Sequence, residues 1–411
     1  MGAVSIEVEV EADEVGFDAG RLARISTHFR HYVDDGRLPG WLVMVSRRGQ
    51  VVYLDTYGHR DVEAGAPIEL DTLFRIYSMT KPITSVAAMM LYEEGAFHLN
   101  DPVGRFIPSF RDLRVFASGT GLAPVTRPAA EPMRMWHLLT HTAGLTYGWG
   151  HVTPVDELYR QAGFEWGAPA GVDLATACDM WSSLPLLYEP GQEWAYSIAT
   201  DVLGRVIEVI AGQTLDQFFA ERILGPLGMD DTSFTALGRE DRLAALYSPA
   251  PNRQVVRNDL MGAGALREPT FLSGGGGLVS TAHDYHRFTQ MLRRGGELDG
   301  VRVLGPRTLA YMAQNHLPRG LTVNETARLF VGDGSFDGVG WGLGFAVMVD
   351  PVRAKVPASR GELFWGGAAS TLFWVDPVEE VTAIFLTQLL PSSTYQLRPQ
   401  LRQLVYQALV D

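Results

Sequence analysis

Residues 74–82 read Phe-Arg-Ile-Tyr-Ser-Met-Thr-Lys-Pro and place Ser78 and Lys81 three residues apart at the expected start of a helix. Residues at this spacing share one helical face, so the hydroxyl and the amine can meet. A serine needs a nearby base to act as a nucleophile, and lysine can be that base when burial or a helix N-terminus disfavours its charge. Apolar neighbours and the presence of only one other lysine, Lys355, favour a catalytic pair over a solvated helix face.

The segments around this pair alternate between strand and helix patterns. A helix is expected over residues 79–94, with Gly95 as its stop. On its N-terminal side, Asp18 caps a helix with an apolar stripe, and strands at 41–46 and 51–58 flank a hairpin turn at 47–50. Strand signals are sparse in the middle of the chain, where helices are expected at 135–140, 174–183, 200–211, 215–223, 282–293 and 306–314.

Strand patterns return near the C-terminus, at 342–349, 362–365, 370–375 and 381–386, before a final helix at 395–409. Strands at both ends with helices between them predict one mixed sheet built from both termini, an α+β class. Residues 1–75 and 305–411 then form an α/β sheet domain, and residues 76–304 form a mostly helical domain. The glycines of residues 273–277 lack a following Gly-Lys-Ser/Thr, which favours a tight turn or close backbone packing over phosphate binding.

The composition limits the classes of molecule that the protein is expected to bind. The 411 residues carry a formal net charge of −13, which argues against nucleic acid or an anionic membrane as partner. An acidic N-terminus without a signal-peptide pattern, and the lack of a long apolar run, predict a cytoplasmic protein with no membrane association. The lone Cys178 rules out an internal disulfide and indicates a small buried residue. The sequence is compatible with both a monomer and a homo-oligomer.

Two further motifs lie far from the first in sequence. Tyr196 follows a Glu-Pro-Gly turn and precedes a helix, and a tyrosine beside a lysine ammonium can act as a general base. A buried core tyrosine is the ordinary alternative. The segment Trp365-Gly366-Gly367 ends one expected strand, where small residues let a substrate approach the backbone and an N–H stabilise an oxyanion. A bulged strand is the ordinary alternative there.

The ordered set of Ser78-x-x-Lys81, Tyr196-Ser197-Ile198 and Trp365-Gly366-Gly367 resembles the serine β-lactamase and penicillin-binding protein superfamily. Within it, the chain is most similar to class C β-lactamases and to the β-lactamase-like carboxylesterases of family VIII. The resemblance covers essentially the whole chain. Each motif alone is weak, and further matching stretches lie at residues 71–75, 137–145, 189–191, 226–229 and 276–280.

The resemblance implies a β-lactamase/DD-peptidase-like fold, in which an antiparallel sheet formed from both termini lies beside a helical domain, with the active site between them. It implies that Ser78 is the acylated nucleophile and that Lys81 and Tyr196 exchange its proton. It also implies that the backbone N–H groups of Ser78 and Ala368 hold the oxyanion. The expected substrate-binding residues are Tyr77, Ile198, Trp365, Gly366 and Gly367.

Two departures from the β-lactamase pattern bear on the substrate. Trp365 stands where β-lactamases carry a lysine that helps to bind the substrate carboxylate, and Ile198 stands where they usually carry an asparagine. Both changes replace polar recognition with apolar surface, which favours a neutral ester over an anionic antibiotic. Trp365-Gly366-Gly367 is also the form found in family VIII esterases.

The leading hypothesis is a serine carboxylesterase acting on short-chain or aryl esters, a small-molecule substrate. An acyltransferase using the same acyl-enzyme comes second, a weak β-lactamase or amidase third, and a catalytically dead binding module last. No cofactor is expected. A metal site at His137 and His141 is not expected either, because Leu138 stands where a zincin needs glutamate. Four aromatic residues are candidates for the pocket wall, with a core position as the alternative: Tyr147, Trp149, Trp166 and Trp181.

Overall fold

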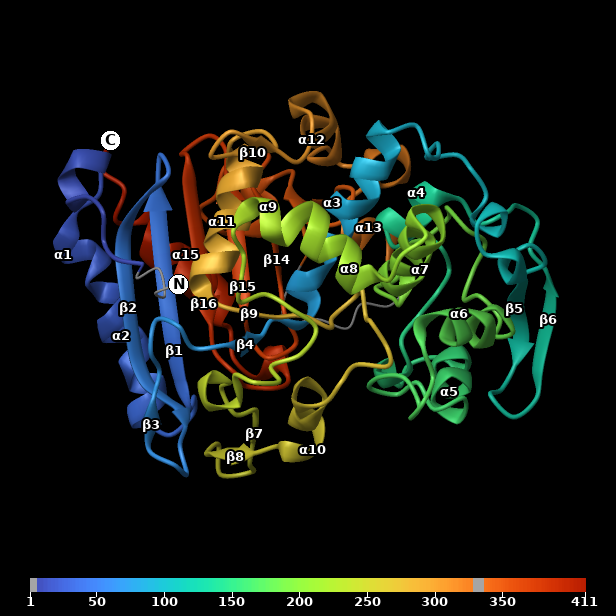
Figure 1. Cartoon of the computed structure of the whole chain (residues 1–411), viewed down its shortest axis with the longest axis horizontal. Helices are drawn as coiled ribbons and strands as arrows, with labels where there is room; N and C mark the ends of the chain where they lie inside the picture. The colour runs from blue at the N-terminus through green and yellow to red at the C-terminus, as the bar shows by residue number, and fades with distance from the viewer. Residues whose placement is uncertain (1–5, 328–335) are drawn as a thin grey trace.

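An eight-stranded antiparallel sheet forms one side of the protein, in a computed structural model that describes residues 6–327 and 336–411 (Figure 1). Its strand order is β12-β13-β14-β15-β16-β1-β2-β3, so strands from the two ends of the chain meet where β1 pairs with β16. This arrangement confirms the expected sheet from both termini. The strands are β1 (Gly40–Arg47), β2 (Gln50–Asp61), β3 (Ala66–Pro67), β12 (Val339–Trp341), β13 (Ala346–Met348), β14 (Leu363–Gly366), β15 (Leu372–Asp376) and β16 (Val381–Leu386).

Helices cover both faces of the sheet, which explains why every residue of β1 is buried. On one face, Phe29 of α2 (Arg24–Asp34) packs against Trp41 and Phe385, and α15 (Leu397–Tyr406) lies beside α2. On the other face lies α11 (Ala282–Arg293), whose Gln290 amide donates to the hydroxyls of Ser46 and Thr382, each at 3.0 Å. The buried hydroxyls of Ser46 and Thr382 are therefore paired.

The helical side of the molecule centres on α3 (Thr80–Glu93), which packs against α7 (Ala199–Ala211). Residues 80–91 are all buried, so α3 is a core helix. The expected helices are present with ends shifted by a few residues. They and the remaining helices are α1 (Ala19–Leu22), α4 (Met135–Leu139), α5 (Pro154–Gln161), α6 (Leu174–Ser182), α8 (Leu215–Phe219), α9 (Gly225–Leu227), α10 (Asp259–Gly262), α12 (Pro306–Met312), α13 (Val323–Thr326) and α14 (Pro351–Ala354).

Two features of the chain differ from the sequence-based expectation. The expected single strand at 342–349 is instead part of a hairpin, because Gly344 takes a φ of +107° and turns the chain between β12 and β13. The middle of the chain also contains short hairpins, which were not expected because their strands are brief and mostly exposed. The short strands outside the large sheet are β4 (Phe74–Arg75), β5 (Arg114–Gly119), β6 (Pro124–Pro128), β7 (Tyr247–Pro249), β8 (Val255–Arg257), β9 (Val279–Ser280), β10 (Glu297–Leu298) and β11 (Val301–Arg302).

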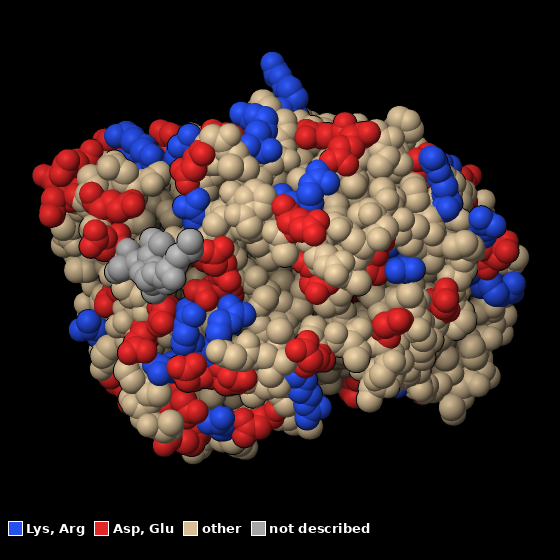
Figure 2. All heavy atoms as spheres, in the orientation of Figure 1, with Lys and Arg blue, Asp and Glu red and all other residues tan. Residues whose placement is uncertain are grey.

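The domain boundaries inferred from the sequence stay a prediction. α11 lies within the range assigned to the helical domain and packs against β15 and β16. Among residues 6–327 and 336–411, no helix is long and apolar enough to cross a membrane. On the face shown in Figure 2, Lys and Arg side chains are interspersed with Asp and Glu and form no single basic patch.

Candidate active site

Ser78 lies in a single 3₁₀ turn, Tyr77–Met79, that leads directly into α3. The turn is strained, since Tyr77 has a φ of +43°, a region that side chains other than glycine rarely occupy. Such strain occurs at functional sites, where the surrounding structure holds the unusual backbone in place. The Ser78 side chain is partly exposed, although the helix that follows is buried. The hydroxyl is therefore accessible at the end of a rigid element.

Lys81 is fully buried one turn into α3, and its ammonium nitrogen has three oxygen partners. Nζ lies 3.2 Å from Ser78 Oγ, 3.0 Å from the Tyr147 hydroxyl and 2.6 Å from the Gly275 carbonyl oxygen. The structure thus brings Ser78 and Lys81 together as the spacing indicated. The contacts with Tyr147 and Gly275 were not expected from the sequence, because both partners are distant along the chain.

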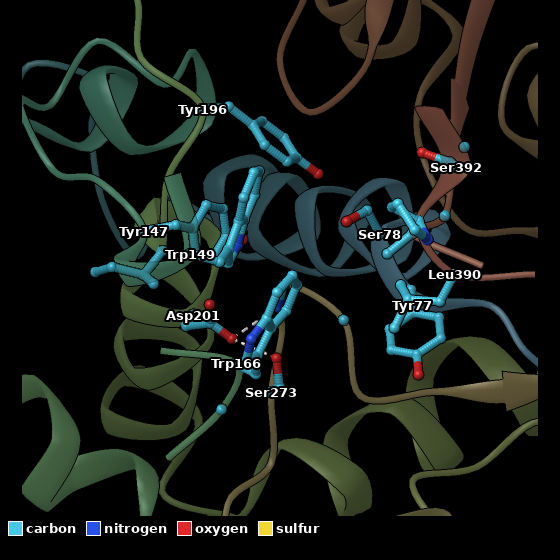
Figure 3. A pocket seen from close by; sticks show the side chains of 18 of the residues that line it. Tyr77, Ser78, Tyr147, Trp149, Trp166, Tyr196, Asp201, Ser273, Leu390 and Ser392 are labelled. Atoms are coloured by element: carbon cyan, nitrogen blue, oxygen red, sulfur yellow. Dashed lines mark hydrogen bonds between the residues drawn. The ribbon is translucent and has the colours of Figure 1, made fainter. Parts of the chain in front are cut away.

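Tyr196 lies on the loop before α7, and its ring faces Lys81, with Nζ 4.6 Å from the ring centroid. Its hydroxyl accepts a hydrogen bond of 3.0 Å from Trp365 Nε1, which joins the second and third sequence motifs directly. Figure 3 shows the Tyr196 hydroxyl and the Ser78 hydroxyl directed into the same space. Trp341 and His141 pack around the Tyr196 ring, so its position is fixed on several sides.

The end of β14 lies beside the Ser78 turn, which places the third motif at the nucleophile. Gly367 has to be glycine, because a Cβ there would lie 2.3 Å from the Ile76 carbonyl oxygen. In the described residues, neither the Ser78 N–H nor the Ala368 N–H donates to another backbone group. Ser78 and Ala368 line the same cavity, and two such N–H groups are the kind of donor that an oxyanion hole requires.

A cavity of about 500 Å³ opens at Ser78, large enough for a small organic substrate. Tyr77, Tyr196 and Ile198 line it, as do Trp365, Gly366, Gly367 and Ala368, so the cavity brings together all the expected substrate-binding residues. All four aromatic candidates for the wall also lie there. Tyr147 stacks on Trp149 at 5.2 Å between ring centroids, and Trp149 stacks on Trp166 at 6.1 Å (Figure 3).

Three charged side chains lie on the cavity wall. Glu165 pairs with His151 at 3.0 Å, and the buried Asp201 accepts hydrogen bonds from Ser273 Oγ and the Gly275 N–H. The third, Arg398, reaches the wall from α15 beside Gly366. The rest of the wall is largely aromatic, aliphatic or glycine.

The neighbouring histidine and tyrosine titrate outside the physiological range. Burial lowers the pKa of His141 well below its usual value, and the charge of Lys81 lowers it further. Burial raises the pKa of Tyr147 well above its usual value, with smaller contributions from Tyr196 and Asp201. His141 is therefore a neutral imidazole that packs against Tyr196, and Tyr147 is a neutral phenol that can accept the Lys81 hydrogen bond.

His137 and His141 have structural partners rather than metal-binding ones. His137 Nδ1 accepts a hydrogen bond from the Arg134 N–H at the start of α4, and His141 Nδ1 lies 3.2 Å from Ser197 Oγ. Across residues 6–327 and 336–411, no group of three His, Cys, Asp or Glu side chains is placed to hold a metal ion. The expectation that the enzyme works without a cofactor stays a prediction.

Sequence reasoning missed two residues of the site. Tyr147 was considered only as a wall residue, and Asp201 was not considered at all. The presence of Asp201 on the first turn of α7, five residues after Tyr196, is a signal that could have been followed. The contacts of both with Lys81 and Gly275 exist only because the tertiary fold brings α3, α7 and the glycine segment together.

The antiparallel sheet from both termini, the helical layer and the Ser-Lys pair between them define a hydrolase of the serine β-lactamase type. The family model named Beta-lactamase matches residues 25–407, so the chain belongs to this family. This confirms the resemblance found in the sequence, the fold class and the assignment to serine hydrolases.

The similarity to known proteins extends over almost the full chain. Protein Rv1367c of Mycobacterium tuberculosis is 37% identical over 369 residues, 88% of each chain. Esterase EstB of Burkholderia gladioli is 33% identical over 391 residues, 90% of this chain and 91% of EstB. The solved structure of EstCE1, described as a hydrolase with promiscuous acyltransferase activity, superposes with a TM-score of 0.81 at 29% identity and covers 94% of this chain and 99% of EstCE1.

Proposed function

We propose that the protein is a serine carboxylesterase that hydrolyses short-chain or aryl esters through an acyl-enzyme on Ser78. The observation that carries the proposal is the contact of Lys81 Nζ with Ser78 Oγ at the mouth of a largely aromatic cavity. The similarity to EstB and EstCE1, which are named as an esterase and a hydrolase, supports the same reaction.

In the proposed acylation step, Ser78 Oγ attacks the ester carbonyl carbon while its proton passes to Tyr196, whose phenolate is stabilised by the Lys81 ammonium. The C–O double bond becomes an oxyanion held by the N–H groups of Ser78 and Ala368. The proton then passes to the alkoxide oxygen as the bond between the carbonyl carbon and that oxygen breaks. The alcohol leaves, and the acyl group stays on Ser78.

Deacylation uses the same groups in reverse. Water gives a proton to Tyr196 and attacks the acyl carbon, and the second oxyanion occupies the same hole. When this intermediate collapses, Ser78 Oγ leaves with the returning proton and a carboxylic acid is released. Because Tyr196, Lys81 and the two N–H groups serve both halves, loss of one of them should slow both acylation and deacylation.

The wall of the cavity supports a neutral substrate with an apolar or aromatic group. Trp365 occupies the position of the β-lactamase lysine and donates to Tyr196, so it cannot replace the cation that binds a carboxylate. Trp149 and Trp166 offer a stacked aromatic surface to a flat ring. Burial of a substrate carboxylate against the aromatic part of this wall, away from Arg398, would be costly.

The proposal is tested by measuring hydrolysis of p-nitrophenyl butyrate and the intact protein mass during turnover. We expect release of nitrophenolate and a butyryl adduct on the wild type, and neither with Ser78→Ala. Ser118→Ala, which changes an exposed serine in β5, is the matched control and should behave as the wild type. Equal turnover by Ser78→Ala and wild type would overturn the assignment.

An acyltransferase is the second candidate, because the acyl-enzyme can pass its acyl group to an alcohol instead of water. The description of EstCE1 as having promiscuous acyltransferase activity supports it. The two functions are separated by adding methanol to the p-nitrophenyl butyrate reaction and measuring methyl butyrate against butyric acid. Ester formation that exceeds the molar share of methanol in the solvent would favour the transferase.

We also propose a small-molecule ester as the only partner the reaction needs, and a cytoplasmic location. The location is supported by the use of a single cysteine, Cys178, which is buried and unpaired. Fractionation of the cells that produce the protein, followed by detection with an antibody, tests the location. Recovery of the protein outside the cytoplasmic fraction would contradict it.

A further inference from the structure

A buried carboxylate is linked to the Lys81 ammonium through the backbone of one residue, Gly275. Asp201 Oδ1 accepts hydrogen bonds from the Gly275 N–H at 2.9 Å and from Ser273 Oγ at 2.6 Å (Figure 3). The carbonyl oxygen of the same Gly275 accepts the 2.6 Å hydrogen bond from Lys81. Asp201 is only 3% exposed, so it is held away from bulk water beside the catalytic lysine.

The glycine segment at residues 273–277 is fixed between α3 and α7 by these contacts. A Cβ on Gly275 would lie 2.6 Å from Asp201 Oδ2, and one on Gly274 would lie 2.8 Å from the Thr200 carbonyl oxygen. Thr84 of α3 also donates to the Gly274 carbonyl oxygen at 2.6 Å. The glycines therefore serve close backbone packing, as expected from the sequence, and this packing brings Asp201 to Gly275.

We propose that Asp201 is a positioning residue that holds the Gly275 carbonyl against Lys81 and supplies the negative charge that balances the ammonium. The proposal rests on the proposed function, in which Lys81 belongs to the catalytic group. The carboxylate is separated from the lysine by one residue, Gly275, so it acts through the backbone of Gly275 and through space rather than by direct contact. Its negative charge favours the ammonium form of Lys81.

Apart from Tyr196, whose phenolate forms in the proposed mechanism, the other titratable groups around Lys81 do not supply this charge. His141 and Cys178 are buried and neutral, because burial lowers the pKa of the imidazole and raises that of the thiol. The raised pKa of Tyr147 keeps it a phenol. Arg205, on the same helix as Asp201, is paired with Glu208 at 3.0 Å.

Lys81 and Asp201 also act on each other. Burial raises the pKa of Asp201, and the nearby charge of Lys81 opposes that rise, as do the hydrogen bonds from Ser273 and Gly275. The same linkage requires the Asp201 carboxylate to stabilise a positive charge on Lys81. Tyr196 faces the same ammonium, so a loss of the carboxylate charge should also make its phenolate easier to form.

The test exploits the fact that the chain contains only two lysines. Protein labelled with ¹³C at lysine Cε gives two NMR signals, from Lys81 and from the exposed Lys355, which is the internal reference. In Asp201→Asn, we expect the Lys81 signal to titrate at lower pH than in the wild type, by about one pH unit. Both limbs of the pH profile of kcat/KM for p-nitrophenyl acetate should move in the same direction.

Two further variants separate charge from structure. Ser273→Ala removes a hydrogen bond to Asp201 but keeps its charge, so the Lys81 signal and both limbs should stay within a few tenths of a pH unit of the wild type. The double variant Asp201→Asn with Ser273→Asp moves the carboxylate across the same hydrogen bond and should return the Lys81 signal and both limbs toward the wild-type values. If the Asp201→Asn variant does not fold, the double variant is measured in its place and compared with the wild type.

Two results would overturn the proposal. One is an Asp201→Asn variant whose Lys81 signal and limbs coincide with those of the wild type, because a purely structural residue would lower stability without moving them. The other is a double variant with the same signal and limbs as Asp201→Asn. The NMR signal does not require turnover, so failure of this proposal is distinguishable from failure of the proposed esterase activity.

Discussion

The site contains two tyrosines close to Lys81, and their contacts assign them different tasks. The Tyr147 hydroxyl accepts the Lys81 hydrogen bond at 3.0 Å and has a pKa raised by burial, so it stays protonated. The Tyr196 hydroxyl instead faces Ser78 and accepts a hydrogen bond from Trp365. At the scale of single residues, Tyr196 is suited to move the proton and Tyr147 to hold Lys81 in place.

Substitution of each tyrosine by phenylalanine separates these tasks. Tyr196→Phe should lower kcat for p-nitrophenyl butyrate by about a thousandfold, the range of a lost general base. Tyr147→Phe should lower it about tenfold, because it removes one hydrogen bond to Lys81. Steady-state kinetics with thermal unfolding as a check on folding measures both, and a larger loss with Tyr147→Phe would reverse the assignment.

Trp166 is 54% exposed at the outer end of the aromatic stack, which makes it a test of substrate class. Trp166→Ala should raise KM for naphthyl acetate by about 2- to 10-fold, the change in affinity that corresponds to the loss of one aromatic pair. KM for ethyl acetate should stay unchanged, because this ester has no ring to stack. Leu260→Ala, which removes another exposed apolar side chain, is the control, and an equal rise for both esters would contradict the stacking role.

At the scale of elements, we expect the proposed catalysis to depend on how closely the end of β14 approaches the turn before α3. Gly367→Ala should lower kcat by about a hundredfold, because its Cβ would meet the Ile76 carbonyl oxygen at 2.3 Å and push the strand away from Ser78. Gly264→Ala is the matched control, since no atom lies within 4 Å of its Cβ. Kinetics of both variants, with circular dichroism to verify folding, test this packing, and equal activities would show that β14 can move without cost.

At the scale of the whole molecule, buried histidines make folding sensitive to acid. Burial, with contributions from His283, Arg287 and Arg293, lowers the pKa of His286 to about 4, and its Nδ1 has no partner in the described residues. Below pH 6.5 the unfolded chain protonates this histidine while the folded chain does not. The unfolded state therefore binds more protons, and stability falls as the pH falls from 6.5 toward 4.

His286→Leu removes this titration and should flatten the pH dependence. The difference in the free energy of unfolding between pH 7.5 and pH 5 should shrink by about 2 kcal/mol, corresponding to a shift of about 1.5 pH units at 1.36 kcal/mol each. Urea unfolding at the two pH values measures it, with pH 7.5 as the reference. His137 keeps a residual dependence, because burial lowers its pKa to about 3. An unchanged difference would mean that His286 is accessible to protons in the folded state.

The sequence was sufficient for the sheet from both termini, because apolar strand-forming runs and the turn at residues 47–50 are local signals that tertiary packing did not override. It failed at residues 342–349, where Gly344 turns the chain and apolar residues on both sides mimic one strand. The short hairpins of the middle region were also not predicted, because exposed two-stranded ribbons have little hydrophobic pattern to detect.

The sequence by itself determined the class of this protein and the candidate residues of its chemistry: the proposed nucleophile, its lysine, the tyrosine and the glycine strand are carried by local motifs and their order along the chain. Only the tertiary structure decided the partners of Lys81. Tyr147, Gly275 and, through Gly275, Asp201 come from segments up to 194 residues away. The physical reason is that hydrogen bonds and burial act over a few ångströms in space, whereas sequence patterns report only the neighbours along one element.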